Sequence, residues 1–449
     1  MLALYNRYEA EAAGACFREL IFMHSGGVAC FRKLTFMHSG GVACFRKLIF
    51  MHRGGAEVLQ MKGVGMKRFE FYTPTKVVFG RGSISEVATE AKKLGKKGLV
   101  VTDKGMIECG LAKKVTDILE KADIDFFVWS DIVPNPRDVD IEKGADFAIE
   151  EKIDYLIAIG GGSAMDTAKA IGAIITNGGR CEDWYEGNLK KPIAPLICIP
   201  TTCGTGSEVT HESIVNNTKT LEKDCIWGPM NSVKVAIIDS QVIDHLPGKI
   251  LASTGMDALT HAVEAYVCKA SNPITDALAI KAIEMIGKSL ISAVENHDEE
   301  SLENMMAAST MAGMAFGNSD VASVHSISEA LGGFYDIPHG VANAMMLAPV
   351  SRLSIPGAIE KYVDVAKALG VDTTGMTSEQ AANAGVDYIQ KMADDLKIPH
   401  FCDLDIVNPK DFDRLATTAA NADETEDNPV EMTKEDFIKL FEQLYNENK

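Results

Sequence analysis

The stretch GMDALTHAVEAY, residues 255–266, is the part of the sequence from which the organisation of the chain can be worked out. Asp257 and His261 stand four residues apart in a segment without proline, so on a helix their side chains share one face. This spacing suits two ligands of one metal ion. A single pair of this kind more often forms a hydrogen bond on a helix surface, so a metal site requires further ligands.

Two further candidate ligands lie in SVHSISEALGGFYDIPHGVANAM, residues 323–345. His325 and His339 stand there in an otherwise apolar and glycine-rich run, which is an unusual setting for two imidazoles. With Asp257 and His261 they supply one carboxylate and three imidazoles, a tetrahedral set suited to Fe²⁺ or Zn²⁺. The sequence therefore predicts a metal site.

Length and composition limit the class of protein. The 449 residues allow two full domains, and 46% hydrophobic with 24% charged residues is typical of a globular protein. A net charge of −19 without a basic run argues against nucleic acid or an anionic membrane as partner and favours a small molecule. No apolar run approaches the ~18 residues of a spanning helix, and no signal peptide is evident, so we expect a cytoplasmic location. The ten cysteines include no CxxC pair and are expected to be reduced thiols.

A tandem repeat of 14 residues occupies residues 16–55. It could be a metal-binding or β-solenoid array, but three short copies are few for a solenoid that supports itself. We therefore expect residues 1–65 to be an appended segment outside the fold, which would begin near Met66. The repeated cysteine and histidine pairs are Cys16 and His24, Cys30 and His38, and Cys44 and His52.

From residue 76 onward, short apolar runs alternate with helical patterns. The runs KVVFG, GLVVTD, DFFVWS and IDYLIAI are each followed by an amphipathic segment, which indicates a parallel sheet with helices on its faces. The runs LIAI and LICI lack polar alternation and are predicted to be strands buried on both sides. We expect an α/β domain over residues 66–244.

Three predicted strand ends carry groups that suit a phosphate-containing ligand. The glycines at 160–162 open a helix at Ser163 and would let a pyrophosphate approach backbone N–H groups, although they could also form only a tight turn. The loop CIPTTCGTGSEVT, residues 198–210, offers several hydroxyls, as loops of many folds do. Asp103 can accept a hydrogen bond from a ribose, or it can act as an ordinary helix N-cap.

After about residue 244 the strand signal fades, and residues 245–449 contain successive helical patterns broken by Gly, Pro and Asn. A second, all-helical domain is predicted there. The four candidate metal ligands fall in this domain and the glycine turn falls in the first, so the reaction is expected in the cleft between them.

The order of these motifs resembles the iron-containing (group III) alcohol dehydrogenases. A GGGSxxD turn, a PTTxGTGSE loop, a GxDALTHxxEAY helix and a VHS…PHGxxNA segment occur in step from about Phe71 to the end of the chain. The resemblance implies a Rossmann-like dinucleotide-binding α/β domain followed by an all-α metal-binding domain, the fold shared with dehydroquinate synthase. It also implies reversible oxidation of a small alcohol to an aldehyde with NAD or NADP, in a homo-oligomer, with Fe²⁺ or sometimes Zn²⁺ as a Lewis acid.

By motif position, the resemblance assigns roles to individual residues. Asp257, His261, His325 and His339 match the metal ligands of the family. The residues that match its cofactor-binding positions are Asp103, Asn135, Gly161, Gly162, Ser163, Asp166, Thr201, Thr202, Thr205 and Lys223. Because Asp103 places a carboxylate where the 2′-phosphate of NADP would lie, NAD is expected to be preferred over NADP.

Two positions depart from the family pattern. Glu329 replaces a histidine that is proposed to relay the substrate proton, so it could relay that proton, join the metal shell or hydrogen-bond a ligand, and we favour the last role. His211 replaces an asparagine near the substrate wall.

Two alternative functions remain beside the dehydrogenase. A metal-dependent lyase of the dehydroquinate-synthase type would need several basic residues, whereas residues 256–346 are poor in arginine. A non-catalytic metal-binding protein would need no cofactor loop. The sequence leaves the particular alcohol open.

Overall fold

The computed structural model of the chain describes residues 68–220 and 222–447 with their side chains. Before residue 68 it describes only the backbone of short strands. The chain divides into two compact units, Met1–Phe69 and Glu70–Lys449.

The first unit contains antiparallel strand pairs. β1 pairs with β2, β4 pairs with β5, and β6 lies between β3 and β7. The strands are β1 Ala3–Glu9, β2 Phe17–Met23, β3 Cys30–Leu34, β4 Met37–His38, β5 Ala43–Cys44, β6 Leu48–His52 and β7 Gly55–Leu59. The predicted 14-residue repeat falls in this unit, and its cysteine and histidine side chains lie outside the described residues.

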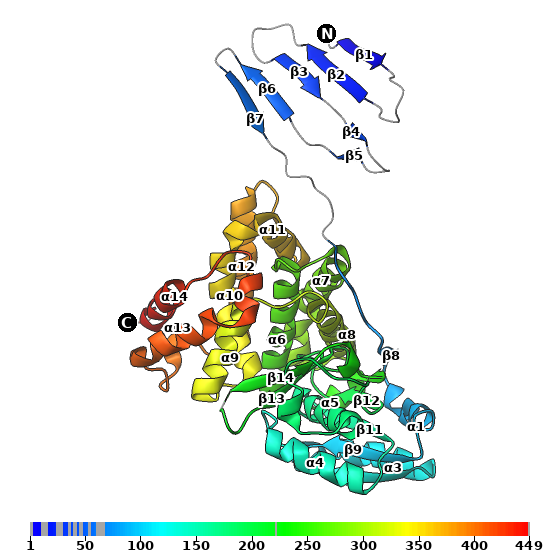
Figure 1. Cartoon of the computed structure of the whole chain (residues 1–449). Helices are drawn as coiled ribbons and strands as arrows, with labels where there is room; N and C mark the ends of the chain where they lie inside the picture. The colour runs from blue at the N-terminus through cyan, green and yellow to red at the C-terminus, as the bar shows by residue number, and fades with distance from the viewer. Residues whose placement is uncertain are drawn as a thin grey trace. The chain divides into compact units, whose positions relative to one another are not determined.

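A six-stranded parallel sheet forms the first half of the second unit (Figure 1). Its strand order is β10-β9-β11-β12-β15-β8. The strands are β8 Lys76–Phe79, β9 Lys97–Thr102, β10 Asp125–Trp129, β11 Tyr155–Gly160, β12 Leu196–Pro200 and β15 Val235–Ile238. Every residue of β11 and β12 is buried, which confirms the prediction for LIAI and LICI.

Helices cover both faces of this sheet, because successive strand residues point to opposite sides. On β9, Val100 packs in one hydrophobic cluster with Val115 of α3, whereas Leu99 and Val101 pack in a second cluster with Ile141 of α4. The helices of this half are α1 Val87–Ala91, α2 Lys104–Glu108, α3 Leu111–Lys121, α4 Asp138–Glu150 and α5 Gly162–Asn177.

The strand order reverses between β9 and β11. From β9 the chain continues outward to β10, whereas from β11 it continues in the opposite direction to β12 and β15. The carboxyl ends of β9 and β11 therefore flank the crevice in which open α/β sheets bind ligands. Asp103 follows β9, and the glycine turn follows β11.

A two-stranded hairpin, β13 Glu212–Asn216 with β14 Lys223–Trp227, was not predicted from the sequence. Both strands are short and only partly buried, and polar residues interrupt their apolar ones. The hairpin carries Lys223 at the start of its second strand.

The loop between β12 and β13 is fixed from two sides. On one side, the fully buried Lys169 of α5 donates hydrogen bonds from Nζ to Ser207 Oγ at 2.9 Å and Thr210 Oγ1 at 3.2 Å. On the other side, Gly206 has a φ of +61°, and a Cβ there would lie 2.6 Å from the Cα of Gly313 in α8. The loop therefore contacts α8 through backbone, with no room for a side chain at the crossing.

After β15, the described chain forms helices and no further strand. The helices are α6 Gly248–Val267, α7 Pro273–Asn296, α8 Glu299–Phe316, α9 Ser323–Tyr335, α10 His339–Ser354, α11 Ile359–Ala368, α12 Ser378–Asp395, α13 Phe412–Ala420 and α14 Lys434–Asn446. α6 contacts α7, α8 and α10 and is buried along most of its length (Figure 1). The predicted change from an α/β half to a helical half is confirmed.

One hydrophobic cluster includes residues from the sheet and from the helical half, so Glu70–Lys449 shares a continuous core. Among the described helices, none combines the length and the apolar character required to cross a membrane.

Candidate active site

Four side chains from three helices meet at one point. Asp257 and His261 lie one turn apart on α6, His325 lies in the first turn of α9, and His339 is the first residue of α10. One potential ligand atom from each residue lies within 4.8 Å of those of the other three. The structure thus brings together all four predicted ligands, although 82 residues separate the first from the last.

A buried carboxylate orients one of these histidines. Glu264 Oε2 lies 2.5 Å from His325 Nδ1, and Glu264 Oε1 accepts a hydrogen bond of 2.7 Å from the backbone N–H of Val324. Nδ1 of His325 therefore donates to the carboxylate, and its Nε2 faces the cluster as an acceptor. Glu264 was not predicted, although it lies in the same motif, three residues after His261.

The other two imidazoles are also held in place. The ring of His261 stacks on Phe316 with 4.4 Å between the ring centroids and 17° between the planes. Nδ1 of His339 lies 3.2 Å from the hydroxyl of Ser328. Each ring is therefore fixed by a contact outside the cluster itself.

The cluster contains more hydrogen-bond acceptors than the hydrogen-bond donors that the described residues supply. Nδ2 of Asn343 lies 2.7 Å from Asp257 Oδ1 and 3.1 Å from Nε2 of both His325 and His339. An amide has two N–H groups for these three acceptors, and the buried Nδ1 of His261 has no hydrogen-bond partner. A divalent cation that prefers nitrogen and oxygen ligands fits this donor set.

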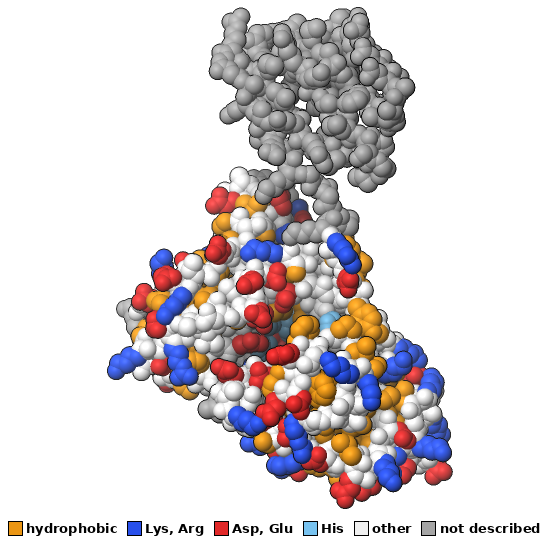
Figure 2. Space-filling model, in the orientation of Figure 1, with side chains coloured by type: hydrophobic (Ala, Val, Ile, Leu, Met, Phe, Trp, Pro, Cys, Tyr) orange, Lys and Arg blue, Asp and Glu red, His pale blue; other side chains and the backbone are white. Residues whose placement is uncertain are grey.

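A cavity of about 540 Å³ opens beside the cluster. Figure 2 shows acidic side chains gathered around a hollow in which histidine atoms are visible. The sheet half and the helical half both line this cavity. Among the predicted residues, those that line it are Asn135, Gly162, Ser163, Asp166, Thr205, Lys223, His261, His325, Glu329 and His339.

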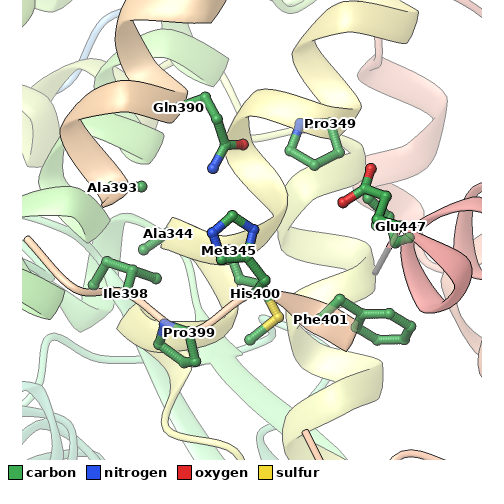
Figure 3. Close-up of a pocket in the computed structure, with 11 residues that line it drawn as sticks. Ala344, Met345, Pro349, Gln390, Ala393, Ile398, Pro399, His400, Phe401 and Glu447 are labelled. Atoms are coloured by element: carbon green, nitrogen blue, oxygen red, sulfur yellow. The ribbon is translucent and has the colours of Figure 1, made fainter. Parts of the chain in front are cut away.

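A second hollow, between α10 and the C-terminal helices, is much smaller (Figure 3). Its volume of about 40 Å³ has room for about three water molecules. His400 and Glu447 line it, and none of the predicted site residues does. The larger cavity is therefore the candidate site.

Glycines of the predicted phosphate turn leave space beside the hydroxyl-rich loop. A Cβ on Gly162 would lie 2.9 Å from Thr205 Cγ2, and a Cβ on Gly161 would lie 3.5 Å from Thr202 Cγ2. Side chains at these glycines would fill the gap between turn and loop. The gap lies at the N-terminus of α5, where backbone N–H groups and the helix dipole favour a phosphate.

Asp103 stands at the crevice and also caps a helix. Its Oδ1 accepts a hydrogen bond of 3.1 Å from the N–H of Met106, so the alternative N-cap role is present. A Cβ on Gly160 would lie 3.3 Å from Asp103 Oδ2, so the second oxygen faces the glycine turn. This oxygen can accept a hydrogen bond from a ligand.

Two predicted cofactor residues make hydrogen bonds within the protein. Thr201 is 2% exposed, and its backbone N–H donates to the carbonyl of Gly160 at 3.0 Å. Asp166 accepts a hydrogen bond of 2.7 Å from the hydroxyl of Ser207. These contacts tie the loop to the turn and to α5; Asp166 lines the cavity, and the buried hydroxyl of Thr201 has no hydrogen-bond partner among the described residues.

Glu329 lines the cavity one turn after His325 on α9. Among the described residues it makes no hydrogen bond to a histidine of the cluster, and Glu264 holds the contact that the sequence analysis favoured for it. His211 also lines the cavity, where its Nε2 lies 3.3 Å from a carboxylate oxygen of Glu212.

Two family models match almost all of the second unit. The model "Iron-containing alcohol dehydrogenase" matches residues 74–240, and the model "Fe-containing alcohol dehydrogenase family, C-terminal" matches residues 251–445. The chain belongs to the iron-containing alcohol dehydrogenase family. The stated resemblance is therefore confirmed, and the lyase and the non-catalytic protein are not favoured.

Individual relatives agree with this assignment. The chain is 38% identical to 1,3-propanediol dehydrogenase of Citrobacter freundii, over 84% of this chain and 99% of that protein. It is 35% identical to choline dehydrogenase of Bacillus subtilis (strain 168), over 86% of this chain and 98% of that protein. A crystal structure of a 1,3-propanediol oxidoreductase superposes with a TM-score of 0.82 at 36% identity, over 84% of this chain and all of that one.

Iron-containing alcohol dehydrogenases carry out reversible oxidation of an alcohol to an aldehyde, and this chain is an oxidoreductase of that kind with a metal cofactor. A divalent metal supplies Lewis acidity toward an alcohol oxygen, and a nicotinamide supplies the hydride acceptor. The protein contributes the positions of these groups and a cavity from which water can be excluded.

The charge states of the cluster suit a bound cation. Burial lowers the pKa of His325 and His339, so both imidazoles are neutral and offer a lone pair. Burial raises the pKa of Asp257, but His261, His339 and the amide of Asn343 outweigh it, so this pKa is lowered overall. The carboxylate of Asp257 and the neutral imidazoles of His325 and His339 are therefore available as ligands at neutral pH.

Proposed function

We propose that Asp257, His261, His325 and His339 bind Fe²⁺, and that NAD lies across the crevice between β9 and β11. The convergence of the four ligand atoms within 4.8 Å beside a 540 Å³ cavity carries this proposal. That cavity extends from the cluster to the glycine turn. A small alcohol or aldehyde then lies between the cluster and the nicotinamide.

The experiment that tests this function is NADH formation by the full chain reconstituted anaerobically with Fe²⁺. Turnover of small alcohols is expected after addition of Fe²⁺, with less or none in the metal-free protein, because the cluster alone supplies no Lewis acid. Zn²⁺ in place of Fe²⁺ provides the comparison between the two metals. Equal turnover with and without metal would contradict the proposal.

Cofactor choice is expected to depend on Asp103. The wild-type enzyme should prefer NAD, because the second carboxylate oxygen accepts from a ribose hydroxyl and repels a 2′-phosphate. These effects together are worth ~1–3 kcal/mol, or roughly 5- to 150-fold in kcat/KM. Asp103→Gly should reduce or reverse the preference at little cost to the α2 cap, since glycine replaces aspartate at an N-cap for about a few tenths of a kcal/mol. Steady-state kinetics with both cofactors measure the ratio.

As a control for that variant, the carboxylate of Asp117 in α3 is paired with Lys113 away from the crevice. Asp117→Gly changes the charge equally but should leave the cofactor ratio unchanged. A wild-type enzyme that already prefers NADP would contradict the role of Asp103.

We also propose that residues 1–65 lie outside the catalytic fold. The family models begin at residue 74, and contacts divide the chain at residue 69. A chain that begins at Met66 should show the melting temperature and the kcat of the full chain. A large loss of either on deletion would show that the segment supports the enzyme.

A further inference from the structure

Three carboxyl groups line the part of the cavity that belongs to the helical half. Asp320 precedes α9, Glu329 lies on α9, and Glu424 lies on the short 3₁₀ helix η8 Asp423–Asp427. All three line the same cavity as His325 and His339. We refer to Asp320, Glu329 and Glu424 as the acidic wall.

No ion pair holds the acidic wall among the described residues, although the charge of Lys223 lowers the pKa of Glu329 in part. The backbone N–H of Val321 donates to Asp320 Oδ1 at 2.8 Å. Glu329 has no hydrogen bond from any described residue. All three residues are half-buried, and carboxylates withdrawn from water are normally paired, so these oxygens are available to a ligand.

Mutual repulsion adds to this lack of partners. Burial, followed by the carboxylate of Glu424, raises the pKa of Glu329 to about 7. Burial, followed by Asp427 and Glu424, raises the pKa of Asp320 to about 7. A positive group between these carboxyls would remove the repulsion and replace the water lost on burial.

We propose that the acidic wall selects alcohols that carry a positively charged ammonium group, primary or quaternary. The inference rests on the proposed function, because the hydroxyl of such a substrate must face the metal cluster. Glu329 follows His325 by one helical turn, which separates their Cβ atoms by roughly 5–6 Å. Both side chains line the same cavity, so a short chain between hydroxyl and ammonium would let one molecule reach both.

The charged residues that line the cavity do not favour an alcohol that carries a negative charge. Lys223 is the lysine among the cavity-lining residues, and no arginine lines the cavity. Its ammonium lies near α9, since a Cβ on Gly332 would be 3.6 Å from Nζ, and its position on β14 matches a cofactor lysine of the family. Above pH ~7, where all three carboxyls are ionised, they outnumber the one ammonium and would repel a carboxylated or phosphorylated alcohol.

The test compares alcohols of equal shape and different charge with the Fe²⁺-reconstituted full chain. One pair is 3-amino-1-propanol and 1-butanol, and a second pair is choline and 3,3-dimethyl-1-butanol; 3-hydroxypropanoate represents the anions. We expect kcat/KM to be about tenfold or more higher for the cation of each pair, and lowest for the anion. Binding to the enzyme–NADH complex, followed by NADH fluorescence, should show the same order without turnover.

Variants connect the preference to the acidic wall. Glu424→Gln should reduce the cation-to-neutral ratio about tenfold, and Asp320→Asn provides a second variant if the first has a lowered melting temperature. Glu426→Gln is the matched control, because Glu426 lies two residues away on η8 with an exposed side chain. The control should retain the wild-type ratio.

The outcomes separate the two proposals. Absence of metal-dependent turnover with every alcohol and both cofactors would overturn the proposed function, while the binding order would still test the acidic wall. Turnover with a preference for the neutral alcohol of each pair, or a ratio that Glu424→Gln leaves unchanged, would overturn the role of the acidic wall and leave the dehydrogenase function intact.

Discussion

Replacement of His261 by alanine is expected to abolish both metal retention and turnover, while the dinucleotide still binds. His261 contributes one of four ligands from the buried helix α6, and its ring is fixed against Phe316. Its loss leaves three ligands and removes the Lewis acid from the cavity. Among the described residues, no hydrogen bond joins His261 to the glycine turn or to the loop after β12, so the cofactor site should remain intact. His339→Ala should have the same effect.

Metal content after purification and fluorescence titration with NADH measure these two effects. His245→Ala serves as the control, because His245 is exposed in the turn before α6 and, among the described residues, makes no hydrogen bond or ion pair with the cluster. A His261→Ala protein that retains a full equivalent of metal would show that the ligand set is wrong. Loss of NADH binding together with metal would show that the two sites are not independent.

Replacement of Glu264 is expected to have the second largest effect, although this side chain is not one of the proposed ligands. Glu264→Leu removes the acceptor for His325 Nδ1 and leaves the buried N–H of Val324 unpaired. Partners of this kind typically contribute about 10- to 100-fold in metal affinity or activity. Glu264→Gln keeps the shape and one acceptor, so its effect should be smaller.

A purely structural role of Glu264 would lower the melting temperature of the metal-free protein without a change in metal affinity. We expect instead that metal affinity falls in the order wild type, Glu264→Gln, Glu264→Leu. Competition with a chelator measures this order. Glu295→Gln, at an exposed site on α7, provides a matched control. Equal metal affinity in all four proteins would contradict the positioning role.

Local patterns in the sequence were sufficient to predict the features that depend on the repeat of a helix or a strand. The i,i+4 spacing placed Asp257 and His261 on one face of a helix, and apolar runs without alternation identified the two central strands. His325 and His339 are predictable as candidate ligands because imidazoles are unusual in an apolar run. That all four converge depends on how α6, α9 and α10 pack, which the spacing alone does not determine.

Other features of the site required the three-dimensional structure. Glu424 lies 167 residues after Asp257, in the run ADETEDNP, which has the composition of a solvated loop. Asp320 follows a turn that shows no functional signal. Glu264 was visible in the motif, but its partner Nδ1 of His325 is 61 residues away. Glu264 makes the contact to a ligand that the sequence suggests for Glu329, and the role of Glu329 stays a prediction.

The fixed loop between β12 and β13 has a consequence for how the cofactor associates. Lys169 holds it from within α5, and the contact of Gly206 with Gly313 holds it against α8. Ordering a flexible loop costs about 1–2 kcal/mol per residue in backbone entropy. A loop that is rigid before the dinucleotide arrives avoids this cost, so more of the contact energy appears as affinity and a slow closure step is unnecessary.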